Sequence, residues 1–301
     1  MKFALFPGCT IADRLPFIEK SIRMIAPHFD IDLIDLPFTC CPEPNSVRSF
    51  SDMTWLTLGA RNLALAEEAG VNIMAACAGC FESLSMSKHV LDTNASAKEE
   101  VNQVLRSIGR EYKGEVNVYH IQQVLYDDVG KDALTKKVKH PINMRVVTHP
   151  GCHTLRPQKL LHIDDSEAPV KLDELVSALG MESLEYMDKV MCCGAGVRGT
   201  NRDVAFGVLR EKMDSMMMVE PDAAVVFCPT CFISFEAGQR VVNRMFERDY
   251  NIPVYYFTEL LAVAMGLDDV DVILAEHRVK SDALTLHPSD DDNKVENTAS
   301  H

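Results

Sequence analysis

Cysteines dominate the chemistry that this sequence can support. The chain of 301 residues contains ten cysteines, and two pairs of them are adjacent, in PFTCCPEP at 37–44 and KVMCCGAG at 189–196. A disulfide between neighbouring residues strains the ring that it closes, so these pairs indicate another use of sulfur. In a reducing compartment, so many thiols point to metal binding or redox chemistry.

The ten cysteines form two sets with the same order and similar spacing. Each set has a single cysteine, then an adjacent pair, then a C-x-x-C motif, with intervals of 30 and 35 residues in the first set and 39 and 34 in the second. The single cysteine ends FPGC at 6–9 and HPGC at 149–152. The sets are Cys9, Cys40, Cys41, Cys77, Cys80 and Cys152, Cys192, Cys193, Cys228, Cys231.

This pattern predicts an internal repeat of about 140 residues. We expect a first cysteine-rich repeat over 1–141 and a second over 142–287, with the cut at the proline that ends KKVKHP. The remaining 288–301 is acidic and poor in apolar residues, so we expect a disordered tail.

Short apolar runs precede the cysteines and indicate buried parallel strands. The runs are KFALF, IDLIDL and VNIMAA in the first half, and MRVVTH, DKVM (188–191) and AAVVF in the second. Helical patterns lie between them, at 49–70 and 202–220. The first helix has a Ser49-x-x-Asp52 capping-box pattern and Gly70 as its C-terminal cap.

Alternating strands and helices predict an α/β fold with a parallel sheet in each half. Ligands of such sheets bind beyond the carboxyl ends of the strands, which is where the cysteines fall. The thiols of each half can therefore converge on one site.

Composition excludes several other classes of function. The net charge of −14, without a basic stripe, argues against nucleic-acid binding. No apolar run approaches the roughly 20 residues of a membrane span. MKFALFPGC reads as a first strand rather than a signal peptide, so we expect a cytoplasmic protein.

Five thiolates in one set limit the choice of metal. Structural zinc takes four ligands and leaves one cysteine in each set unused. Iron–sulfur clusters tolerate variable ligation, and an opened or distorted cluster suits an adjacent pair that binds neighbouring irons. A disulfide scaffold belongs to small secreted domains, and a thioredoxin-type motif would not need the other cysteines.

The duplicated C…CC…C-x-x-C pattern, from Cys9 to Cys231, resembles the CCG domain of the B-subunit family of heterodisulfide reductases. Proteins of glycolate, lactate, glycerol-3-phosphate and succinate oxidation carry related domains, usually with a fused ferredoxin segment or fewer cysteines. One departure is that Pro42 follows the first pair where Gly194 follows the second. The two cluster environments therefore need not be identical.

The resemblance implies two tandem Rossmann-like repeats related by a pseudo-twofold axis, with a non-cubane 4Fe-4S cluster bound by each set of five cysteines. It implies reduction of the mixed disulfide of coenzyme M and coenzyme B, the last step of methanogenesis, with each cluster capturing one sulfur. The implied partners are the ferredoxin-like iron–sulfur and flavin-containing subunits of heterodisulfide reductase, with a hydrogenase or formate dehydrogenase.

A disulfide reductase also needs a proton donor and groups that bind an anionic substrate. His153, next to Cys152, is the candidate proton donor, although it could instead donate a hydrogen bond to the cluster or cap a turn. The candidate substrate-binding residues are Arg14, Arg156, Arg198, Arg202 and His149.

Two other functions stay open at this point. The chain could be an electron-transfer subunit of a hydroxy-acid oxidoreductase of the lactate or glycolate type, which relays electrons and binds no disulfide. It could also be a double zinc module that organises partners. Metal analysis separates this last class from the others, because it would contain zinc, whereas the other two would contain iron and acid-labile sulfide.

Overall fold

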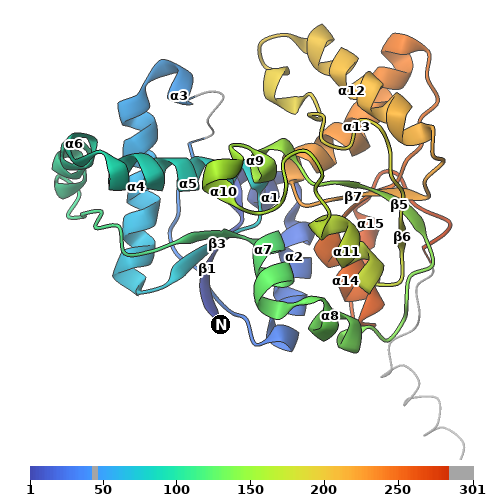
Figure 1. Cartoon of the computed structure of the whole chain (residues 1–301), viewed down its shortest axis with the longest axis horizontal. Coiled ribbons are helices and arrows are strands. Elements are labelled where there is room, and N and C mark those ends of the chain that lie inside the picture. Colours follow the sequence, from blue (N-terminus) through green and yellow to red (C-terminus); the bar gives the residue numbers. More distant parts are fainter. Residues whose placement is uncertain (43–46, 285–301) are drawn as a thin grey trace, which may run out of the picture.

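Two parallel four-stranded sheets form the centre of the molecule (Figure 1), in a computed structural model that describes residues 1–42 and 47–284. The first sheet has the order β2-β1-β3-β4 and the second the order β6-β5-β7-β8. The strands are β1 (Lys2–Phe6), β2 (Asp32–Ile34), β3 (Asn72–Ala75), β4 (Val118–His120), β5 (Arg145–His149), β6 (Glu182–Ser183), β7 (Ala223–Val226) and β8 (Val254–Tyr256). The predicted α/β class and duplication are confirmed, and the predicted tail at 288–301 lies outside the described residues.

Helices connect the strands in both repeats. Those of the first are α1 (Gly8–Arg14), α2 (Pro16–Ile25), α3 (Val47–Phe50), α4 (Asp52–Ala69), α5 (Ala78–Thr93), α6 (Ala95–Arg106), α7 (Ile121–Gln123) and α8 (Lys131–Lys137). Those of the second are α9 (Cys152–Leu155), α10 (Gln158–Leu161), α11 (Lys171–Ala178), α12 (Arg202–Met217), α13 (Pro229–Phe246), α14 (Phe257–Ala264) and α15 (Val270–Ala275). No helix among the described residues has both the length and the apolar character that crossing a bilayer requires.

The shared strand order fixes where a ligand can bind. β1 pairs with β2 on one side and with β3 on the other, and β5 pairs with β6 and β7 in the same way. The chain therefore leaves the sheet in opposite directions after β1 and β3, which opens a crevice at their carboxyl ends.

Two local predictions are wrong. Ser51, not Ser49, caps α4. Its extended backbone lets the side-chain oxygen accept a hydrogen bond of 3.1 Å from the backbone N–H of Thr54. The run DKVM at 188–191 lies in a turn, and the strand that pairs with β5 is the earlier β6. Gly70 does end α4 in the left-handed conformation, as predicted.

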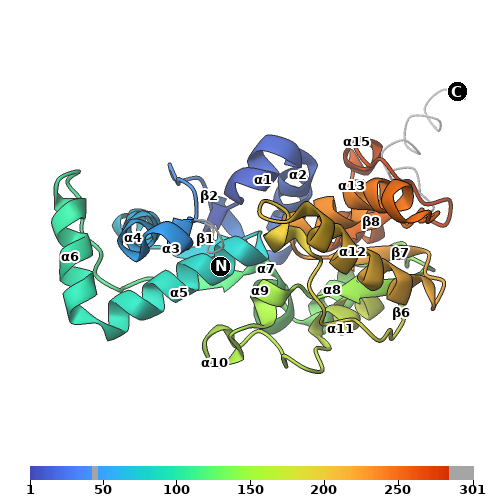
Figure 2. The ribbon, with the colours of Figure 1, turned by 90° about the horizontal axis from the view of Figure 1, so that it is seen from above.

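The two repeats exchange helices. α2 of the first half packs against α14 and α15 of the second, while α8 of the first half packs against α11 (Figures 1 and 2). Ser21 and Thr258 share a hydrogen bond of 2.6 Å on one side, and Tyr126 donates to Glu174 at 2.6 Å on the other. The division at residue 141 stays a prediction, because helices on both sides of it pack on the opposite repeat.

Candidate metal centre

The crevice of each sheet begins at a cysteine. Cys9 lies in α1, directly after β1, and Cys77 is the N-cap of α5, directly after β3. In the second repeat, Cys152 opens α9 after β5, and Cys228 is the N-cap of α13 after β7. These four cysteines therefore lie at the carboxyl ends of the two central strands of each sheet.

Helix geometry accounts for the C-x-x-C spacing. Cys77 and Cys228 precede their helices, and their sulfurs interact with the backbone N–H groups of Cys80 and Cys231 three residues later. These amides belong to the group that a helix leaves unpaired at its start, so each sulfur faces the beginning of a helix. The partial positive charge of the helix start favours the thiolate form.

A serine holds each adjacent pair against the same helix. Ser83 of α5 donates to the carbonyl of Cys41 at 2.6 Å, and Ser234 of α13 donates to that of Cys193 at 2.8 Å. Both serines lie three residues after the C-x-x-C motif, in CAGCFES and CPTCFIS. The repeated serine is a signal for this contact that can be seen in the sequence, although the cysteine pattern alone does not include it.

The thiols other than Cys9 lie close enough to share protons in a series that crosses from one repeat to the other. Cys41 contacts Cys40 and Cys80, and Cys80 contacts Cys77. Cys228, Cys231, Cys193, Cys192 and Cys152 continue the series in the second repeat. Cys77 donates to Cys228, which joins the two sets at the boundary between the repeats.

Shared protons lower the pKa of some thiols and raise that of their neighbours. Hydrogen bonds from Cys152 and Cys193 lower the pKa of Cys192 to about 2, and those from Cys40 and Cys80 lower that of Cys41 to about 4. The bond to Cys192 raises the pKa of Cys193 to about 12. Thiolates crowded this closely repel each other, so full deprotonation requires a cation among them.

Buried groups around the second set fit a metal cluster. His149 is 1% exposed, and among the described residues neither ring nitrogen has a hydrogen-bond partner of good geometry, although the backbone of Lys189 interacts with the ring. Ligand atoms of His149, Cys193 and Cys231 lie within 4.8 Å of one another. An unpaired buried imidazole beside two thiols suits a site completed by a metal or an inorganic sulfide.

The first set shows the same close approach. A Cβ atom on Gly8 would lie 2.7 Å from the sulfur of Cys80, so only glycine fits there, and its φ of +76° also favours glycine. Cys9 and Cys40 are exposed while Cys41, Cys77 and Cys80 are buried. The set therefore extends from the surface into the interior.

His153 lies between the repeats. Its Nδ1 is 3.3 Å from Oε2 of Glu82, which lies on α5 of the first repeat, and the two side chains are 30% and 11% exposed. The carboxylate raises the pKa of His153. His153 also interacts electrostatically with Cys41 and Cys228, which belong to different sets. Nothing in the sequence indicated this contact of Glu82.

The other candidate residues differ in whether their side chains are free to bind a substrate. Arg156 donates to the carbonyls of Val190 and Ser166, and exposed Arg14 lies 3.6 Å from Asp13. Arg198 and exposed Arg202 form no ion pair with any residue in 1–42 or 47–284, although Arg202 stacks on Phe206. His149 is buried beside Cys193 and Cys231, out of reach of a substrate at the surface.

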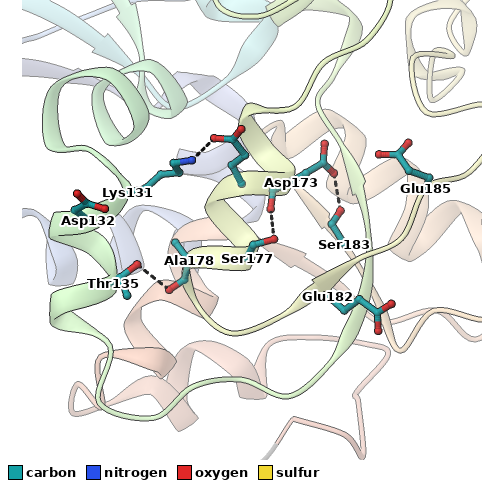
Figure 3. A pocket seen from close by; sticks show the side chains of 10 residues that line it. Lys131, Asp132, Thr135, Asp173, Ser177, Ala178, Glu182, Ser183 and Glu185 are labelled. Carbon is teal, nitrogen blue, oxygen red and sulfur yellow. Dashed lines mark hydrogen bonds and ion pairs between the residues drawn. The ribbon is translucent and has the colours of Figure 1, made fainter.

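A groove of about 620 Å³ lies elsewhere, between α8, α11 and β6 (Figure 3). Five of its ten lining residues are acidic, and Lys131 pairs with Glu174. No cysteine and neither His149 nor His153 belongs to its lining. Its size therefore does not make it the site of the sulfur chemistry.

Comparison with known proteins agrees with the duplicated geometry. The model of the CCG cysteine-rich domain matches residues 3–85 and 146–236. This chain is 37% identical to the B subunit of the ferredoxin/F420H2-dependent CoB–CoM heterodisulfide reductase of Methanosarcina acetivorans. The match covers 93% of this chain and 94% of that protein. This chain is also 28% identical to the 8-methylmenaquinol:fumarate reductase membrane anchor subunit of Wolinella succinogenes, over 88% of this chain and 93% of that protein.

A solved structure shows the same fold. A hypothetical protein from Helicobacter pylori superimposes with a TM-score of 0.76 at 17% identity, over 94% of this chain and 53% of that one, so this chain spans about half of its length. The two domain matches and the 37% identity together establish the relationship. The chain belongs to the B-subunit family of heterodisulfide reductases, within the CCG cysteine-rich proteins.

Proposed function

We propose that this chain is the catalytic iron–sulfur subunit that reduces the mixed disulfide of coenzyme M and coenzyme B to two thiols. Each set of five cysteines holds one non-cubane 4Fe-4S cluster in this proposal. The observation that supports it best is the contact between Cys77 and Cys228, because it brings the two sets together where one disulfide can reach both.

Two clusters, when bound, supply the two electrons of the reaction and two places where a thiolate can be held. A disulfide needs both, since its cleavage yields two sulfur anions. The exposed cysteines of the first set and the half-buried Cys152 and Cys192 of the second mark the side from which a substrate enters.

His153 supplies a proton to a departing thiolate in this proposal. Its position between the sets places the imidazole near both halves of the substrate, and Glu82 orients the ring through Nδ1. With Nδ1 bound to the carboxylate, Nε2 is the ring atom that can face the substrate.

Arginines bind the anionic groups of the substrate. Arg198 and Arg202 suit this role best because their guanidinium groups form no ion pair within the described part of the chain. Arg14 and Arg156 can contribute only by leaving the contacts that they make now.

We also propose that the ferredoxin-like and flavin-containing subunits of a heterodisulfide reductase deliver the electrons. Ten free cysteines favour the cytosol, where thiols stay reduced. An upstream hydrogenase or formate dehydrogenase remains part of this proposal.

A second candidate is an electron-transfer subunit that binds no disulfide. The relative from Wolinella succinogenes, named as a subunit of a fumarate reductase, favours it. The paired sets suit this relay less well, because electron transfer alone does not require two sites that converge on one opening.

Anaerobic purification with iron and sulfide analysis tests the proposal. We expect about four irons in each cysteine set and thiol release from the mixed disulfide with a reduced electron donor. Cys193→Ser should remove the second cluster and leave the first visible by electron paramagnetic resonance (EPR). Equal loss of both signals, zinc in place of iron, or full activity after exposure to air would contradict the proposal.

A further inference from the structure

A buried lysine distinguishes the second cysteine set from the first. Lys212 of α12 is 0% exposed, and its Nζ donates to the backbone carbonyls of Asp188 and Lys189, just before Cys192 and Cys193. The ammonium also lies 4.7 Å from the ring centre of Tyr186. Burial lowers the pKa of Lys212 to about 7, while the negative charges of Cys231 and Cys193 act in the opposite direction and favour its charged form.

The first repeat has a neutral side chain in the corresponding role. Asn62 of α4 is 0% exposed; its amide donates to the carbonyl of Cys40 at 3.0 Å and accepts the amide of Thr39 at 2.9 Å. Asn62 and Lys212 each lie on the helix that follows an adjacent pair. From there, each binds the backbone at or just before that pair. Only the second repeat does so with a buried charge.

Two further differences also make the surroundings of the second set more polar than those of the first. His149 ends β5 where Phe6 ends β1, and the imidazole lies beside Cys193 and Cys231, a polar group that the first repeat lacks at the corresponding position. The backbone N–H of Gly194 donates to the sulfur of Cys192 at 3.4 Å. Pro42, its counterpart after the first pair, has no N–H to donate.

A positive charge and N–H donors stabilise the more negative, reduced form of an iron–sulfur cluster and raise its potential. We infer that the second set holds its cluster at a higher reduction potential than the first, with Lys212 as the main positioned charge. The second cluster then accepts the first electron from a low-potential one-electron donor; no bond forms or breaks in this step.

Other cations do not remove this asymmetry. His153 interacts with Cys41 of the first set and with Cys192 and Cys228 of the second, so its charge does not oppose this asymmetry. Arg61 donates to the carbonyl of Pro37 near the first pair, but it is half-buried at the surface, where water screens its charge. Buried Lys212 lacks such screening.

This inference rests on the proposed binding of one cluster by each set, and potentiometric titration followed by EPR tests it. The reconstituted full chain should titrate in two steps. Cys41→Ser, which leaves the second set, should retain the upper step, and Cys193→Ser should retain the lower one. A single step, or the reverse assignment, would overturn the inference.

Lys212→Gln keeps a hydrogen-bond donor and removes the charge, so it should move the upper step to a more negative potential and leave the lower step unchanged. Lys212→Arg is the control that retains the charge. If Lys212→Gln fails to fold, His149→Phe, which copies the first repeat, should lower the same step. Failure of the wild-type chain to bind iron would refute the proposed function, whereas two bound clusters of equal potential would refute only this inference.

Discussion

Adjacent cysteines place two sulfurs at different depths in the protein. Cys40 is exposed and Cys41 buried, while Cys192 is half-buried and Cys193 buried. One sulfur of each pair can therefore anchor a cluster from the interior, and the other can hold it at the side open to substrate. A single cysteine would not span that distance, because one side chain offers one ligand atom.

His153→Ala should leave both clusters assembled and slow disulfide reduction by about 100-fold, since a positioned acid contributes at least that much. The deficit should grow as the pH rises toward the pKa of His153, which Glu82 raises, and should stop growing above it, because the imidazole then no longer holds the proton. Steady-state kinetics with EPR of the same preparation measures both effects. Substitution of exposed His89 by alanine is the control, and an unchanged rate in His153→Ala would exclude the proposed proton donor.

At the scale of elements, each site depends on a tight passage from a central strand into a helix. Gly8 follows β1 at a φ of +76°, and Gly151 follows β5 at a φ of +88°. The turn at Gly8 brings its backbone close to Cys80 at the start of α5, the helix that follows the neighbouring strand β3. The shape of the passage, as well as the cysteines, therefore determines whether the sulfurs converge.

Gly8→Ala should deplete iron from the first set, because the new methyl group would lie 2.7 Å from the sulfur of Cys80. Gly70→Ala is a matched control: its φ of +64° gives similar backbone strain, of about 1–2 kcal/mol, with no atom within 4 Å of the methyl group. Iron analysis should show a loss in Gly8→Ala and none in Gly70→Ala. Equal iron content in both would show that sulfur contact does not limit that position.

The sequence predicts the elements next to the cysteines better than the others. Strands β1, β3, β5 and β7 were expected because their four or five residues are largely apolar and end close to a cysteine. β4 and β8, with three residues each, are too short for a periodic signal, and β6 has only two. The exchange of helices has no local pattern at all, and neither do the buried charges Glu82 and Lys212, which resemble surface residues.

At the scale of the whole molecule, contacts from the ends of the outer strands β4 and β8 hold the two C-x-x-C motifs together. Tyr256 at the end of β8 donates to the carbonyl of Ala76, next to Cys77, at 2.7 Å. His120 at the end of β4 packs edge-on against Phe227, next to Cys228, with ring centres 5.9 Å apart. Each repeat thus supports the C-x-x-C motif of the other, as expected if a pseudo-twofold axis relates them.

Tyr256→Phe should lower the free energy of unfolding by about 1–3 kcal/mol, because a buried carbonyl loses its donor. Urea unfolding of the reconstituted chain measures the change. Tyr119→Phe provides the comparison: Tyr119 packs on Phe3, and no hydrogen bond of its hydroxyl joins it to the described residues. Equal stability of the two variants would show that the bond to Ala76 does not hold the repeats.

The central claim is that two clusters act on the two sulfurs of one disulfide. EPR of the reduced, oxygen-free protein tests it most directly, before and after addition of the mixed disulfide of coenzyme M and coenzyme B. A thiolate bound to iron changes the electronic environment of that iron, so the disulfide should change both cluster signals and a single thiol chiefly one. If electrons pass through the protein while the disulfide changes neither signal, the chain is an electron relay and the claim is wrong.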